Sequence, residues 1–224
     1  DYGSWSAYGN RYWPHKYLID INGEIVYDHI GEGAYQETEK KIQEALKQRL
    51  AKLGLTSPLT EDLAGPVGAA ATDFTKIGTP EIYFGASRNI AFANGRAQQA
   101  GLQILFEPAA IEPNKLYLAG EWSFDKEFAR NQNAPAKIII RYQAQDVYFV
   151  AAADTEIKIR LRRDGQKLSG AAGVDVEDYY GESYATVKEE RLYKLIEDKT
   201  GYGQHTLELL IEQPGLKAFT FTFG

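Results

Sequence analysis

The sequence contains no cysteine and no methionine among its 224 residues. Without cysteine there is no disulfide, no thiolate metal site and no cysteine nucleophile. Histidine is also scarce, because only His15, His29 and His205 are present, far apart and without an HExxH or similar metal-ligand spacing. The chain as given is therefore expected to carry out no thiol chemistry, and the sequence predicts neither a metal nor a cofactor.

Positive charge and long apolar runs are missing as well. The 25 Lys and Arg residues are outnumbered by 31 Asp and Glu, so the net charge is −6, which argues against broad phosphate neutralisation and excludes nucleic acid as a main partner. No stretch approaches the ~20 apolar residues of a membrane span. The first residues contain neither the charged n-region nor the apolar h-region of a signal peptide. We expect a soluble chain that begins within a larger protein.

The remaining composition is that of a folded protein with real cores, since 44% of residues are hydrophobic and 25% are charged. The patterns along the chain divide it into three parts. Residues 1–54 mix strand and helix signals. Residues 55–79 show neither the helical nor the strand spacing of apolar residues and indicate a linker, whereas in residues 80–224 apolar and polar residues alternate with period two. Two folded units joined by a linker are the expected organisation.

The first part predicts a hairpin followed by a helix. The runs Tyr17–Asp20 and Glu24–His29 are strand-like and are separated by Asn22-Gly23, which supplies the positive φ angles of a tight turn. The apolar spacing over Tyr35–Leu53 then predicts a helix, and Gly54 predicts its C-terminal end.

The last part predicts an antiparallel β-sandwich or jelly roll. Ile157, Ile159 and Leu161 alternate with basic residues, and Arg163-Asp164-Gly165 predicts a turn. Leu207–Ile211 alternates in the same way, and Phe219, Phe221 and Phe223 are expected on one face of a last strand. Further predicted strands are Leu116–Phe124, Ala136–Gln143, Val147–Ala152 and Arg191–Ile196. Many short strands with no strong helix between them are typical of a sandwich.

The segment Tyr12–Val26 resembles the second half of a thioredoxin-like domain of the redoxin type. In that family a proline held cis precedes a strand, a Gly-containing turn, a second strand and a final helix. The flanking segments Tyr2–Asn10 and Gly31–Tyr35 resemble those of the DipZ-type thiol:disulfide interchange proteins of cytochrome c biogenesis. In these proteins a β-sandwich resembling a carbohydrate-binding module follows, and Thr79–Gly85 and Ala218–Gly224 fit that arrangement.

The resemblance implies an α+β chain: a partial thioredoxin-like fold (hairpin plus helix) followed by an antiparallel, jelly-roll-like β-sandwich. It makes Pro14 the candidate cis-proline, whereas the family's Cys-X-X-Cys would lie N-terminal to every residue present, so no catalytic residue is assigned. We expect a truncated chain, or missing strands that another chain supplies. The exposed strand edge of the half-domain then predicts a homo-oligomer. The family implies a periplasmic or otherwise extracytoplasmic location and a membrane tether outside this chain.

Aromatic residues of the second part are the candidate ligand-binding groups, because a sugar needs flat aromatic faces with hydrogen-bonding groups beside them. Tyr179, Tyr180 and Tyr184 stand in a polar stretch expected to be a loop, and Tyr202 lies between two glycines. Trp122 is a further candidate, but its strand parity with Leu116, Leu118 and Phe124 favours the core. Loop tyrosines that merely cover the sandwich end are the structural alternative for the others.

The other polar groups favour structural interpretations. His15 and His29 are expected as ordinary polar strand residues, since neither has a partner in local spacing. The carboxylates Asp175, Glu177, Asp178 and Glu182 lack an ordered calcium-loop motif and are expected to be solvated.

Three functions remain open. The chain is the C-terminal part of a thiol:disulfide oxidoreductase, inactive as supplied and working with a redox protein partner; or a carbohydrate-binding module; or a docking module that holds a redox domain on a membrane partner.

Overall fold

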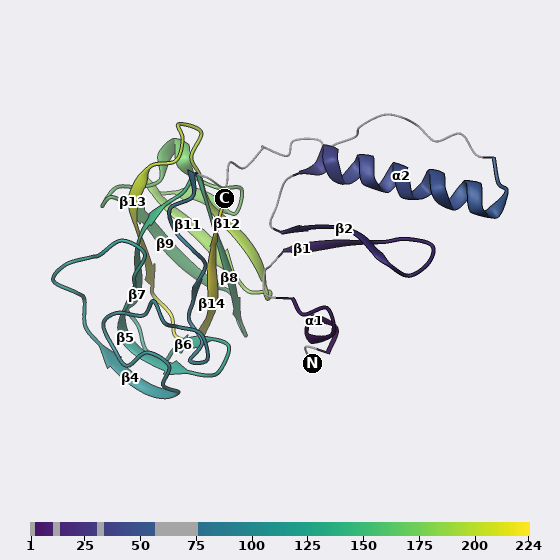
Figure 1. Ribbon diagram of the computed structural model, residues 1–224. Coiled ribbons are helices and arrows are strands. Elements are labelled where there is room, and N and C mark those ends of the chain that lie inside the picture. The colour runs from purple at the N-terminus through teal and green to yellow at the C-terminus, as the bar shows by residue number, and fades with distance from the viewer. Residues whose placement is uncertain (1–2, 11–13, 31–33, 57–75) are drawn as a thin grey trace. The chain divides into compact units, whose positions relative to one another are not determined.

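The computed structural model describes residues 3–10, 14–30, 34–56 and 76–224. The chain divides into two compact units, Asp1–Thr72 and Asp73–Gly224 (Figure 1). None of the helices formed by the described residues has the length and apolar character needed to cross a membrane. Most of the predicted linker 55–79 lies outside the described residues, so its extent stays a prediction.

The first unit contains the predicted hairpin and helix. Its elements are α1 (Gly3–Ala7), β1 (His15–Ile19), β2 (Ile25–Ile30) and α2 (Tyr35–Leu53). β1 and β2 pair antiparallel, and the carboxylate of Asp20 accepts the backbone N–H groups of Asn22 and Glu24 at 2.8 and 3.0 Å across the turn. α2 ends at Gly54, which has a φ of +63° and lets Leu55 N–H donate to Leu50 O.

None of the described residues of this unit is buried, so these residues form no core of their own. No residue of α2 is buried, and apolar side chains such as Ile25, Val26 and Ile30 are about half exposed, at 51%, 47% and 49%. A hairpin and one helix provide too few surfaces to cover their own apolar residues. The unit therefore presents apolar surface on both its sheet and its helix.

The second unit is built almost wholly of antiparallel strands that form a nearly closed, barrel-like sandwich (Figure 1). The strand order is β10-β11-β9-β13-β7-β5-β6-β14-β8-β12, with β3 beside β14 and β4 beside β5. The strands are β3 (Ile82–Tyr83), β4 (Gly101–Leu105), β5 (Leu116–Phe124), β6 (Ala129–Asn131), β7 (Ala136–Gln143), β8 (Asp146–Ala153), β9 (Ile157–Arg163), β10 (Val176–Tyr179), β11 (Glu182–Val187), β12 (Arg191–Glu197), β13 (Gln204–Ile211) and β14 (Leu216–Phe223), with a short 3-10 helix, η2, at Ser169–Ala171.

β5 joins the two layers of the sandwich. Its first half pairs with β7, whereas its second half pairs with β6 and β4. The sandwich is confirmed, and every long strand expected from alternation is present with ends within a few residues of the expected ones. The core is continuous across both layers, and its largest fully buried side chains are Trp122, Tyr142, Tyr193, Phe84, Phe149 and Phe221.

One expected alternation is wrong. Phe219, Phe221 and Phe223 were expected on one face, but the β14–β8 register shifts between Ala218 and Thr220. This bulge inserts Phe219 without a partner on β8, so Ala218 and Phe221 are both buried although their spacing is odd. Phe219 is half-buried and packs against Phe128 with ring centroids 5.5 Å apart.

Candidate functional site

Three of the predicted tyrosines lie on one β-hairpin, not in a loop. Tyr179 ends β10, Glu182 begins β11, and these two residues are paired. Tyr180 and Gly181 occupy the turn with φ angles of +50° and +80°, as in the two-residue turns that match strand twist. The expected loop is therefore wrong. The alternation of Ser183, Ala185 and Val187, all buried, with polar or aromatic neighbours is the sequence signal that indicates this strand.

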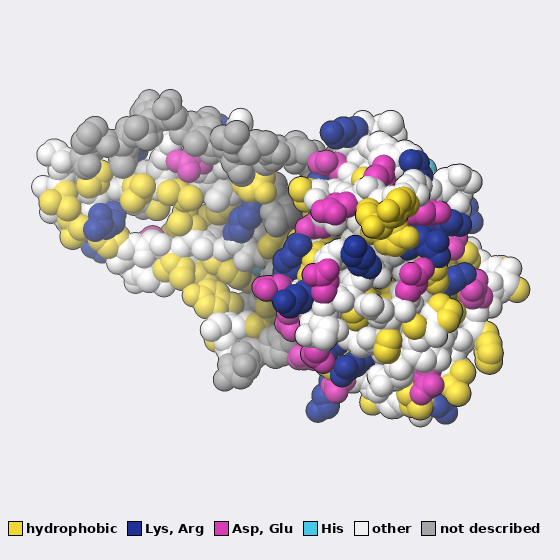
Figure 2. All heavy atoms as spheres, turned by 180° about the vertical axis from the view of Figure 1, so that it is seen from behind, with side chains coloured by type: hydrophobic (Ala, Val, Ile, Leu, Met, Phe, Trp, Pro, Cys, Tyr) yellow, Lys and Arg dark blue, Asp and Glu magenta, His cyan; other side chains and the backbone are white. Residues whose placement is uncertain are grey.

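The hairpin presents an aromatic surface. Tyr180 is 90% exposed and Tyr179 is 54% exposed. The ring of Tyr179 lies edge-on to the rings of Tyr180 and Tyr184, with centroids 4.4 and 6.3 Å apart, and Lys158 Nζ lies 5.1 Å from the Tyr179 ring centre. Figure 2 shows a raised group of hydrophobic-coloured side chains, a class that includes tyrosine, among acidic and basic ones on this face of the sandwich.

A shallow hollow on the same sheet continues this surface. In the antiparallel register Tyr184 lies opposite Arg160, Arg160 opposite Leu210, and Leu210 opposite Lys137. Directly opposed residues share a face, so these side chains form one row across four strands. Lys137, Arg160, Arg162, Glu208 and Leu210 line a hollow of about 190 Å3.

The charges around the hollow are balanced. Arg162 donates to Glu182 at 2.8 Å, Arg160 contacts Glu212 at 3.3 Å, and Lys137 contacts Glu107 at 2.6 Å. The hydrogen bond from Arg162 lowers the pKa of Glu182, which keeps this carboxylate ionised and able to accept hydrogen bonds near neutral pH. A surface with stacking faces, donors and acceptors but little net charge suits a neutral polar ligand.

The other two aromatic candidates lie elsewhere. Trp122 is fully buried, and its Nε1–H donates to Ala119 O at 3.0 Å, so the core alternative describes its position and its ring faces no solvent. Tyr202 is half-buried before β13, and Lys76 Nζ lies 5.7 Å from its ring centre. The fold thus brings together Tyr179, Tyr180 and Tyr184, and it adds Arg160, Arg162 and Glu208, which sequence reasoning did not single out as site residues.

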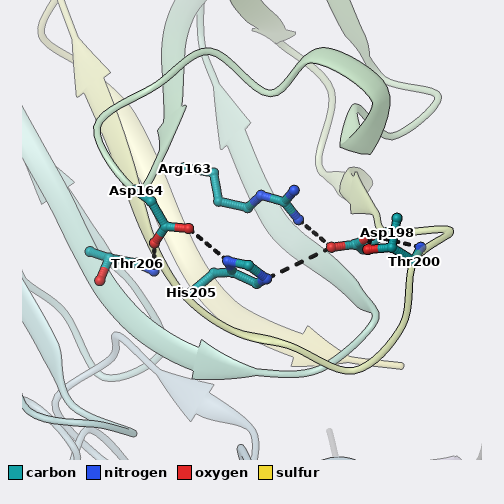
Figure 3. A network of polar contacts seen from close by, with 6 residues as sticks. All are labelled: Arg163, Asp164, Asp198, Thr200, His205 and Thr206. Atoms are coloured by element: carbon teal, nitrogen blue, oxygen red, sulfur yellow. Dashed lines mark hydrogen bonds and ion pairs between the residues drawn. The ribbon is translucent and has the colours of Figure 1, made fainter.

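A second polar cluster connects β9 to the segment between β12 and β13 (Figure 3). Arg163 Nη1 donates to Asp198 Oδ2 at 2.5 Å, and Thr200 donates to the other oxygen of Asp198 from its backbone N–H and its hydroxyl, at 2.9 and 2.6 Å. Asp164 accepts the backbone N–H of Thr206 at 2.8 Å and contacts His205 Nδ1 at 2.6 Å. His205 Nε2 lies 3.8 Å from Asp198.

The contacts of this cluster tie the end of β9 to the loop before β13. Burial opposes ionisation of Asp198, but the hydrogen bonds from Thr200 and Arg163 outweigh it and lower the pKa of the carboxyl. Burial also opposes ionisation of Asp164, whose pKa is lowered by Thr206 N–H and His205. Both carboxylates are therefore held as anions by fixed donors. The Thr200 hydroxyl donates to Asp198, so it is not held as a nucleophile toward His205.

Of the four carboxylates considered as calcium ligands and expected to be solvated, Asp175, Asp178 and Glu182 accept hydrogen bonds from neighbouring groups. Asp175 accepts from Arg191 and from Lys194 N–H, both at 2.7 Å, and Asp178 accepts from the Ser183 hydroxyl at 3.0 Å. Within the ranges that the structure describes, no group of three His, Asp or Glu side chains is arranged to hold a metal ion.

In the first unit, His15 has partners that its sequence spacing hides. Its Nε2 lies 2.8 Å from Asp28 Oδ2, and its Nδ1 lies 2.8 Å from Asn10 Oδ1 and 2.7 Å from the Tyr17 hydroxyl. The hairpin register places Asp28 opposite Tyr17. His15, two residues before Tyr17 on the same face of the strand, therefore lies diagonally across from Asp28. The Trp13–Pro14 bond includes a residue outside the described ones, so the cis form at Pro14 stays a prediction.

Comparison with known proteins places the β-sandwich in a family and finds relatives of the whole chain. Residues 79–224 match the family described as thioredoxin like C-terminal domain. Protein DipZ of Mycobacterium bovis and of Mycobacterium tuberculosis are each 30% identical to this chain over 230 aligned residues, which is 100% of the chain and 29% of each relative. The chain thus spans less than a third of these relatives.

Among solved structures, a family two carbohydrate esterase from Clostridium thermocellum in complex with cellohexaose is a distant neighbour. It has a TM-score of 0.39 and 14% identity, over 49% of this chain and 31% of the esterase. The sequence matches, in contrast, cover the whole β-sandwich and extend through the first unit. The chain is homologous to DipZ along its length and belongs to the thioredoxin like C-terminal domain family.

Proposed function

We propose that this chain is the C-terminal part of an extracytoplasmic, thioredoxin-like thiol:disulfide oxidoreductase of the cytochrome c biogenesis type. The observation that carries the proposal is the 30% identity to DipZ along the entire chain, through both units. The redox dithiol is supplied from outside these residues, because the chain contains no cysteine. The chain itself contributes the end of the redox domain and an attached β-sandwich.

The apolar surface of the first unit supports this assignment. A strand, a tight turn, a second strand and a helix follow one another in the order expected for the second half of a thioredoxin-like domain. Ile19, Ile25 and Val26 on the hairpin and Leu46 and Leu53 on α2 are between 37% and 51% exposed. If further strands cover this surface, burial of its apolar area stabilises the folded domain by ~25 cal/mol per Å2.

The test joins this chain to the Cys-X-X-Cys half of a thioredoxin-like domain of the redoxin type that Tyr12–Val26 resembles, placed before Asp1. The fusion is expected to reduce insulin with dithiothreitol and to show slow amide exchange in β1 and β2. Its matched control carries serine at both cysteines of the added half, and it should fold equally well without activity. A folded fusion with no activity, or with β1 and β2 still in fast exchange, would contradict the proposal.

A specific observation favours a second function, the binding of a neutral glycan by the β-sandwich. The tyrosine hairpin exposes two rings beside Glu182 and the charge-balanced hollow, which together supply stacking faces, donors and acceptors. A site this shallow is expected to bind with a dissociation constant in the millimolar to micromolar range, ~4–8 kcal/mol. The covering of one sandwich end by these tyrosines is the structural alternative.

Titration with cell-wall oligosaccharides followed by NMR tests the glycan site. Shifts are expected in β10, β11 and the strands that line the hollow, and Tyr180→Ala should abolish them. Tyr8→Ala is the matched control, because Tyr8 is also an exposed tyrosine, at 45%, but belongs to the first unit. An absence of shifts at millimolar sugar, or shifts that Tyr180→Ala leaves unchanged, returns the sandwich to a docking role toward a redox or membrane partner.

A further inference from the structure

The edge strand β4 differs from the strands β12 and β10 that end the strand order. The outer edge of β12 is covered, because Gly173 N–H donates to Leu195 O and Ala172 bridges Ile196, whereas β10 contains Glu177 and Asp178. Charged side chains of this kind prevent a free strand edge from pairing with another molecule. β4 has the sequence Gly-Leu-Gln-Ile-Leu, without a charge or a proline, and among the described residues its strand partner is β5 alone. The usual protection is thus absent at this edge.

The solvent face of β4 is apolar. Leu102 is 53% exposed, Ile104 is 68% exposed, and Phe106, just beyond the strand, is 78% exposed, whereas Gln103 and Leu105 between them are both buried at 6%. β4 runs along the outer margin of the sandwich (Figure 1), and hydrophobic side chains are visible along that margin in the view from behind (Figure 2). Side chains of this size, exposed at alternate positions, form a continuous stripe that is typical of an interface.

The backbone of β4 also has groups directed away from β5. Glu121 on β5 uses its C=O for Gln132 N–H and its N–H for the Asn133 side chain, on the side of β6. Trp122, the next residue, therefore turns its backbone groups toward β4 and opposes Gln103. By the same alternation, the N–H and C=O groups of Leu102 and Ile104 point to the free edge. They are donors and acceptors ready for another strand.

We propose that β4 is a self-association edge, at which two copies of this chain pair antiparallel about a two-fold axis at Ile104. In this register Ile104 opposes Ile104 of the second copy, and Leu102 opposes Phe106 in both directions. All six side chains then lie on one face of the joined sheet, because opposed residues share a face. The two Ile104 residues exchange two backbone hydrogen bonds.

The second copy is the occupant that the charges favour. A two-fold contact places like residues together, which is unfavourable for a charged strand and harmless for the uncharged one observed here. An acidic or basic peptide would find no opposite charge on β4 to recognise. Five strand residues bury less than the ~1,200–2,000 Å2 of a standard stable interface, so the dimer should be weak and should depend on concentration.

Sedimentation across a concentration series tests this edge in the full chain. The wild-type chain is expected to form dimers, and Ile104→Lys should weaken dimerisation about tenfold or more by placing like charges at the axis. Val174→Lys is the matched control, because Val174 is an 83% exposed aliphatic residue of the same unit outside β4. Circular dichroism checks that both variants fold.

The absence of cysteine permits a second, geometric readout. In Ile104→Cys the two introduced thiols face each other across the axis, at a Cα separation near ~5.5 Å that a disulfide spans. Oxidation should give a covalent dimer, and Val174→Cys should give far less. A strict monomer at every concentration, a dimer unaffected by Ile104→Lys, or β4 amides protected by another part of the same chain would each overturn the proposal.

Discussion

Arg163 and Asp198 form a shielded ion pair, with Nη1 and Oδ2 2.5 Å apart and side-chain exposures of 19% and 5%. Arg163 ends β9, whereas Asp198 lies between β12 and β13. The pair therefore ties the loop that carries Thr200 and Tyr202 to the C-terminal end of β9. At the same end of β9, Arg162 donates to Glu182 of the tyrosine hairpin.

Arg163→Ala is expected to lower the free energy of unfolding by ~2–3 kcal/mol, because it leaves the Asp198 carboxylate buried without its charged donor. Arg162→Ala is the matched control: it removes the adjacent arginine, whose partner Glu182 lies at the surface, and should cost clearly less. Urea denaturation measures both. Equal losses of unfolding free energy in the two variants would mean that burial of Asp198 does not strengthen its ion pair with Arg163.

Stability should fall in acid because of Asp198 and Asp164. Both carboxyls have a pKa lowered in the folded state, so the folded chain binds fewer protons than the unfolded chain near these pKa values. The stabilisation is fully present above the ordinary aspartate pKa of ~3.9 and disappears as the pH falls through the lower folded values. Unfolding in urea at pH 7, 4 and 3 measures this slope, which Asp198→Asn should reduce. If Asp198→Asn left the pH dependence of stability unchanged, the acid sensitivity would not come from Asp198.

Tyr142→Phe should leave the stability unchanged or raise it by up to ~1 kcal/mol. The Tyr142 hydroxyl is buried and has no hydrogen-bond partner among the described residues, although the Arg163 guanidinium lies near enough to favour the ionised form. Burial dominates and raises the pKa of this tyrosine to about 12. Thermal unfolding measures the change, and a loss above ~1 kcal/mol would show that the hydroxyl has a partner.

The chain by itself should show no insulin reduction with dithiothreitol above the uncatalysed rate. Thiol–disulfide exchange requires an attacking thiolate and a mixed disulfide, and this chain contains no cysteine. Turbidity of reduced insulin is the measurement, with thioredoxin as the positive control. Turnover at the rate of thioredoxin would refute the prediction.

Amide exchange should be faster in β1 and β2 than in β13. Leu207, Leu209 and Ile211 of β13 are fully buried between two paired strands, whereas β1 and β2 pair only with each other among the described residues. Hydrogen exchange followed by mass spectrometry resolves the two regions. Equal protection would indicate that the hairpin is covered in solution.

Local patterns were enough to predict much of this fold. Asn22-Gly23 specifies its turn because glycine adopts positive φ without a steric cost, and Gly54 ends α2 for the same reason. Alternation at Ile157–Leu161 and Leu207–Ile211 predicted which side chains are buried, because successive residues of a strand point to opposite faces. The absence of cysteine alone determined that the chain carries no dithiol.

Tertiary structure decided what depends on pairing between distant segments. Tyr184 meets Arg160, and Arg160 meets Leu210, only through strand register, which no local pattern specifies. A bulge reversed the expected face of Phe219, and the pairing of β4 with β5 directed Leu102 and Ile104 to a free edge. A sequence determines the local backbone preferences and the periodicity of burial. Which residues come together across a sheet depends on the register of strands far apart in the chain, and packing of the whole core selects that register.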